Sequence, residues 1–81
     1  MIFLVHYHRT EGRLVSLRVF DDADSALASV AKIDLEISLI GSADDIEVVL
    51  LRAGTEEILR ESHSRYFRSL KELKESSSKG Q

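Results

Sequence analysis

Residues 2–20, IFLVHYHRTEGRLVSLRVF, decide the fold because they form two extended segments on either side of a turn. Gly12 stands near the end of the turn sequence Arg9-Thr10-Glu11-Gly12-Arg13, where a hairpin loop requires positive φ. If facing residues have numbers that sum to 22, one face of the hairpin is wholly apolar. The residues of that face are Phe3, Val5, Tyr7, Val15, Leu17 and Val19.

The opposite face of the predicted hairpin mixes apolar, basic and imidazole side chains. Its members are Ile2, Leu4, His6, His8, Leu14, Ser16, Arg18 and Phe20. An exposed apolar patch of this kind is unusual in a monomer. The face is therefore a candidate surface for association.

A helix is predicted between Ser25 and Gly41. The acidic residues at 21–24 precede it, where their carboxylates can cap a helix and interact with its dipole. Apolar residues recur at helical spacing, and this stripe consists of Ala26, Val30, Ile33, Ile37 and Ile40. Residues 33–39 also alternate as a strand would, but no Gly, Pro or Asn interrupts the segment before Gly41, which favours the helix.

Two further elements follow. The segment Ile46 to Leu51 is apolar on both sides and predicts a buried strand. A second helix is predicted from Glu56 to about Glu75, because acidic residues open it and lysines lie near its end. The side chains expected to anchor this helix are Leu59, Tyr66, Phe67, Leu70 and Leu73.

The order of these elements predicts a single α+β domain of ββαβα type over residues 1–75, followed by a disordered polar tail at 76–81. The first strand begins with an unbroken apolar run, so we expect it in the centre of a three-stranded antiparallel sheet of order 2-1-3. Both helices are expected on the face that carries Phe3, Val5 and Tyr7.

Composition restricts the classes of protein that the chain can belong to. Its 81 residues are 43% hydrophobic and 31% charged, with a formal charge of −3 and no cysteine. No disulfide or thiolate zinc site is possible, and the acidic balance makes nucleic acid an unfavourable partner. A chain this short can bury only a small core, so its stability as a monomer is marginal, which favours self-association. The apolar run at residues 1–5 is too short for a membrane span, so a cytoplasmic protein without membrane contact is expected.

Catalytic chemistry has little support in the sequence. His6 and His8 project from one strand face and could share a metal ion, but a third ligand is hard to place. Ser62 and His63 are neighbours on a helix and point about 100° apart, which separates a hydroxyl from its base. Helix capping accounts for the acidic residues at 21–24 and 56–57 without Mg²⁺. No catalytic, cofactor-binding or metal residue is predicted, and no cofactor.

The favoured hypothesis is a non-enzymatic interaction module that forms a homodimer through the open sheet face. The predicted interface consists of Ile2, Leu4, His6, His8, Leu14, Arg18 and Phe20. One alternative is a small regulatory or nucleic-acid-associated protein that uses the basic side of the second helix. The basic residues concerned are Arg60, Arg65, Arg68, Lys71 and Lys74. The other alternative is a small metal-dependent enzyme.

Overall fold

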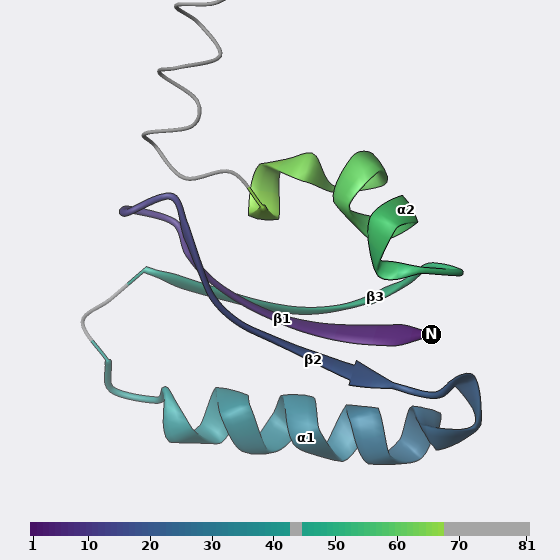
Figure 1. Cartoon of the computed structure of the whole chain (residues 1–81). Helices are drawn as coiled ribbons and strands as arrows, with labels where there is room; N and C mark the ends of the chain where they lie inside the picture. The colour runs from purple at the N-terminus through teal and green to yellow at the C-terminus, as the bar shows by residue number, and fades with distance from the viewer. Residues whose placement is uncertain (43–44, 68–81) are drawn as a thin grey trace, which may run out of the picture.

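A computed structural model describes residues 1–42 and 45–67 of the chain. Its elements are β1 (Ile2–His8), β2 (Arg13–Phe20), a short 3-10 turn η1 (Asp22–Asp24), α1 (Ser25–Ser38), β3 (Ile46–Arg52), α2 (Glu56–Ser62) and a second 3-10 turn η2 (Ser64–Tyr66). The three strands of this described part form one sheet of order β2-β1-β3, with both pairings antiparallel (Figure 1). The predicted fold class and strand order are confirmed.

The β1–β2 hairpin keeps the predicted register over most of its length. Pairing runs as expected from Ile2 with Phe20 to His6 with Ser16, and Gly12 takes a positive φ of 63° in the turn. The register then shifts, so that Tyr7 faces Leu14. The prediction that Tyr7 faces Val15 is wrong, because this bulge inserts one extra residue into β2.

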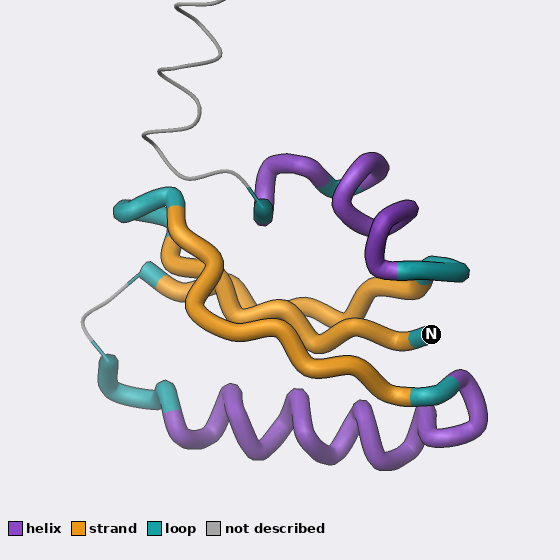
Figure 2. Tube along the Cα trace, in the orientation of Figure 1, coloured by secondary structure: helices purple, strands orange, loops and turns teal. Residues whose placement is uncertain are grey.

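The two helices lie on opposite faces of the sheet, as Figures 1 and 2 show. α1 packs on the face that carries Ile2, Leu4 and Phe20, whereas η2 packs on the face of Val5 and Tyr7. The prediction that both helices share one face is therefore wrong. β1 is apolar on both faces, and a strand of this kind needs cover on each side.

α1 confirms the helical interpretation of residues 33–39, but it packs on the sheet through an unexpected stripe. Ala28 is fully buried, and Ala31 and Leu35 pack beside it against the sheet core. The apolar stripe identified from helical spacing in the sequence faces solvent instead, and its members Val30, Ile33, Ile37 and Ile40 are exposed. Small side chains let the helix lie close to the strands, which accounts for the choice of this face.

The acidic residues before α1 do not cap it as predicted. Asp21 and Asp24 occupy the N-cap positions of η1 and α1, but neither side chain makes a capping hydrogen bond. Asp22 instead pairs with the N-terminal ammonium group at 3.0 Å. At the other end α1 finishes at Ser38, and Gly41 follows with a φ of 85° in the left-handed region that suits glycine.

The second helix is shorter than predicted. The Thr55 Oγ1 accepts a hydrogen bond of 3.1 Å from the backbone N–H of Ile58, and this cap opens α2. The chain leaves the helix at His63, and η2 then lays Tyr66 on the sheet, edge-on to Tyr7 at 5.2 Å between ring centroids. The predicted continuation of the helix toward Glu75, its anchors Leu70 and Leu73, and the tail at 76–81 lie outside the described residues.

The packing of α1 can be tested by adding bulk to its two sides. Ala28→Leu forces extra methyl groups between helix and sheet, so we expect a loss of about 1–3 kcal/mol in the free energy of unfolding. Ser29→Leu adds the same side chain at the next, exposed position and should change the free energy by less than about 0.5 kcal/mol. Urea unfolding of both variants at low protein concentration measures the difference. Equal effects would contradict the orientation of α1.

Candidate functional site

The predicted interface on the sheet is covered by α1. Ile2 and Leu4 are 2% exposed, and Phe20 and His8 are also buried. Leu14 lies on the other face, where it packs against the cluster around Tyr7. Of the predicted interface residues, Arg18 is exposed and lies beside α1. The prediction of an open apolar sheet face is wrong, because the helix fills it.

His6 and His8 lie on the face of β1 that α1 covers. No group of three His, Asp or Glu side chains that could hold a metal ion occurs within residues 1–42 and 45–67. The His8 Nδ1 accepts a hydrogen bond of 3.1 Å from the backbone N–H of Glu11, and the His6 Nε2 is buried without a hydrogen-bond partner. Burial, together with the nearby charges of His8 and Arg13, lowers the pKa of His6 below 6.5.

The pKa of His6 gives the protein a predictable response to acid. The unfolded chain binds a proton on His6 near pH 6.5, whereas the folded chain resists that proton, so stability should fall as the pH drops below about 6.5. Thermal unfolding at about pH 7.5 and pH 5.5 should show a lower melting temperature at the acidic pH. In His6→Gln this decrease should be smaller than in the parent. An equal decrease in parent and variant would remove His6 as its source.

The most developed polar cluster surrounds Glu47 on the opposite face of the sheet. The Glu47 carboxylate accepts hydrogen bonds from the Tyr66 hydroxyl, from Arg9 Nε at 3.1 Å and from Arg65 Nη2 at 2.7 Å. Arg9 also binds Asp45 at 2.8 Å. The cluster joins the turn after β1, the start of β3 and η2.

Burial and hydrogen bonding have opposite effects on the pKa of Glu47, and the effect of the hydrogen-bond donors is the larger. Burial by itself would raise the pKa of Glu47, but hydrogen bonds from Tyr66, Arg9 and Arg65 outweigh it and hold the pKa below 4.5. Burial and the bond to Glu47 raise the pKa of Tyr66, which keeps its hydroxyl protonated as a donor. Each group in the cluster is paired with another protein group, so the arrangement serves to lock η2 onto the sheet.

The side chains on α2 that were considered for catalysis or nucleic-acid binding make hydrogen bonds or ion pairs with other residues of the helix. The Ser62 hydroxyl donates to the Ile58 carbonyl oxygen at 2.9 Å, so it is not directed at His63. Arg60 pairs with Glu56 at 3.4 Å and lies over the ring of Phe67. The other basic residues of the proposed nucleic-acid surface, at 68, 71 and 74, lie outside the described residues.

The structural role of the polar cluster around Glu47 can be tested by removing one oxygen atom. Tyr66→Phe keeps the buried ring but deprives Glu47 of a donor, so we expect a loss of about 1–3 kcal/mol in the free energy of unfolding. Tyr66→Ala also removes the ring and should cost about 3–5 kcal/mol. Urea unfolding measures both. A Tyr66→Phe variant as stable as the parent would contradict a structural role for the hydroxyl.

Several exposed large apolar side chains lie on the outer face of α1 and the turn that follows it. This apolar face consists of Leu27, Val30, Ile33, Ile37 and Ile40, whose exposed fractions range from 54% to 80%. The sequence contained the signal, since four of these residues belong to the predicted stripe. Helical spacing alone does not say which of two apolar stripes on a helix faces the sheet.

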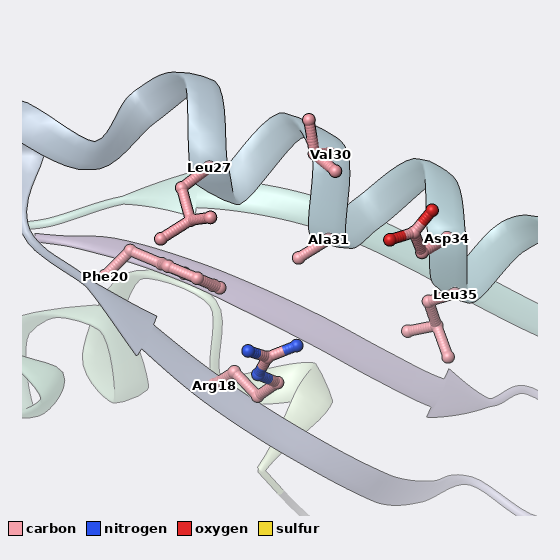
Figure 3. A pocket seen from close by; sticks show the side chains of 7 residues that line it. All are labelled: Arg18, Phe20, Leu27, Val30, Ala31, Asp34 and Leu35. Atoms are coloured by element: carbon pink, nitrogen blue, oxygen red, sulfur yellow. The ribbon is translucent and has the colours of Figure 1, made fainter.

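A groove runs between α1 and β2 along the edge of the apolar face (Figure 3). It has a volume of about 420 Å³, and Leu27, Val30 and Phe20 contribute apolar walls. Arg18 enters from the β2 side and Asp34 from the helix. The guanidinium of Arg18 lies 5.0 Å from the centre of the Phe20 ring. The groove thus combines apolar walls with one charge of each sign.

Comparison with protein-family models, curated proteins and solved structures finds no match to this chain. Among the described residues, no helix is both long and apolar enough to cross a bilayer.

Proposed function

We propose that the protein is a non-enzymatic interaction module that forms a homodimer through the apolar face of α1. The observation that carries the proposal is the exposure of five large aliphatic side chains on one side of α1 and its C-terminal turn. Contiguous apolar surface of this kind marks an interaction site in soluble proteins. The pairing of the Glu47 and Tyr66 cluster within the chain supports a structural role for the polar groups, in place of a catalytic one.

The apolar face offers enough burial to drive association. Full burial of an exposed Val, Leu or Ile contributes about 1.5–3 kcal/mol. Because each of the five side chains is at least half exposed, two such faces together offer on the order of 10 kcal/mol. The loss of translational and rotational freedom on binding costs roughly 4–15 kcal/mol. The gain exceeds the cost only over the lower part of that range, so a weak dimer is expected.

A second copy of the chain suits this surface for two reasons. Two-fold symmetry places the same patch on both sides of an interface, so an apolar patch meets an apolar patch. A domain of 81 residues also has a small core, and α1 contributes mainly alanines to it. Burial of the larger side chains between two copies would therefore stabilise each of them.

The dimer can be tested with one charge on the apolar face. Ile37→Asp places a carboxylate in the contact, where it loses water without gaining a partner, so we expect the dimer to dissociate at concentrations where the parent is dimeric. Ile58→Asp is the matched control, because Ile58 is 51% exposed on α2 and lies outside the apolar face. Analytical ultracentrifugation at about 1–100 μM measures the mass.

Two results would contradict the proposed function. One is a parent protein that remains monomeric throughout this concentration range. The other is a parent dimer that Ile58→Asp disrupts as strongly as Ile37→Asp, since the contact would then not be specific to α1.

A further inference from the structure

Arg18 differs from the other basic residues that the structure describes. Six basic side chains each lie within 4.0 Å of a carboxylate oxygen, namely those of Arg9, Arg13, Arg52, Arg60, Arg65 and Lys32. Within residues 1–42 and 45–67, Arg18 is the one Lys or Arg side chain without such an ion pair. Its contact is with the Phe20 ring, which leaves its N–H donors directed into the groove (Figure 3).

Asp34 lies on the helix side of the same groove. It is exposed, it lies between Val30 and Ile37 along the helix, and no ion pair joins it to Arg18 within 4.0 Å. A carboxylate at the edge of an apolar contact opposes burial unless it meets a cation. The groove therefore holds one charge of each sign without an ion pair among the described residues, at the border of the surface proposed for dimerisation.

We propose that Arg18 of one protomer forms an ion pair with Asp34 of its partner, an inference that depends on the proposed dimer. In a two-fold interface each contact occurs twice, so a patch that carries both members of a pair is complementary to itself. The Arg18 guanidinium, held against Phe20, can bind a carboxylate through two N–H groups. These two pairs would set the orientation in which the apolar faces meet.

The pairing predicts a specific pattern of charge-reversal rescue. Arg18→Asp places two pairs of carboxylates in contact, and Asp34→Arg places two pairs of guanidiniums in contact, so each variant alone should raise the dimer Kd by about tenfold or more. In an equimolar mixture of the two, every contact joins opposite charges, so a heterodimer should form with an affinity near that of the parent. Analytical ultracentrifugation measures the mass, and circular dichroism checks that each variant is folded.

A matched control uses a carboxylate outside the groove. Glu61 is exposed on α2, and Glu61→Arg makes the same charge change as Asp34→Arg. A mixture of Glu61→Arg with Arg18→Asp should not form the heterodimer with the affinity of the parent. If a charge reversal prevents folding, the milder Arg18→Gln and Asp34→Asn form a double-mutant cycle, in which the two changes should be non-additive in the dimer Kd.

The possible outcomes separate this inference from the proposed function. A monomeric parent would overturn both. A dimeric parent whose affinity neither charge reversal changes would overturn the ion pair alone. Rescue in the double variant Arg18→Asp/Asp34→Arg, without rescue in the mixture of single variants, would place the pair within one protomer and also overturn the inference.

Discussion

The burial of β1 on both of its faces is the constraint on which the rest of the structure depends. β1 lies between β2 and β3, and its residues from Ile2 to Val5 are nearly inaccessible to solvent. Because alternate side chains of a strand point to opposite faces, an apolar run without alternation needs a cover above and below. α1 supplies one cover, and α2 with η2 supplies the other. This requirement separates the two helices and produces a three-layered domain from a short chain.

The two covers are built in different ways. The cover on the Tyr7 face is a short helix and a turn, held by the buried ring of Tyr66 and by its bond to Glu47. On the other face, α1 approaches through Ala28 and Ala31, which bury little surface of their own. Its larger aliphatic side chains point away from the sheet. A helix that is apolar on two sides is typical of a helix covered on two sides, which is the state that a dimer would provide.

The sequence predicts the strands of this fold better than the helices. Alternation with period two fixes the pairing of Ile2 with Phe20, and the position of Gly12 fixes the turn. For α1, by contrast, the stripe of Ala28, Ala31 and Leu35 and the stripe of Val30, Ile33 and Ile37 have the same helical spacing. The choice between them depends on how closely the helix approaches the sheet, and that distance is a property of the tertiary structure.

The polar cluster around Glu47 could not be predicted from the sequence either, because its members are far apart along the chain. Glu47 and Tyr66 are 19 residues apart, and their contact exists because the chain leaves α2 at His63. A continuous helix would have carried Tyr66 in another direction. No proline or glycine marks this break in the sequence, and the Tyr66 ring that it positions packs edge-on against Tyr7. Side-chain contacts between elements could be predicted only after the placement of those elements was known.

The β2 edge of the sheet offers a competing route to association, and its residues argue against it. β2 is an edge strand among the described residues, and free edges invite pairing with a second chain. Arg13 and Arg18 place charges along β2, and the bulge opposite Tyr7 interrupts its regular hydrogen bonding. Both features are common means of protecting an edge from strand addition. Arg18 can therefore discourage pairing along β2 while its guanidinium borders the groove beside α1, which favours association through the helix over extension of the sheet at β2.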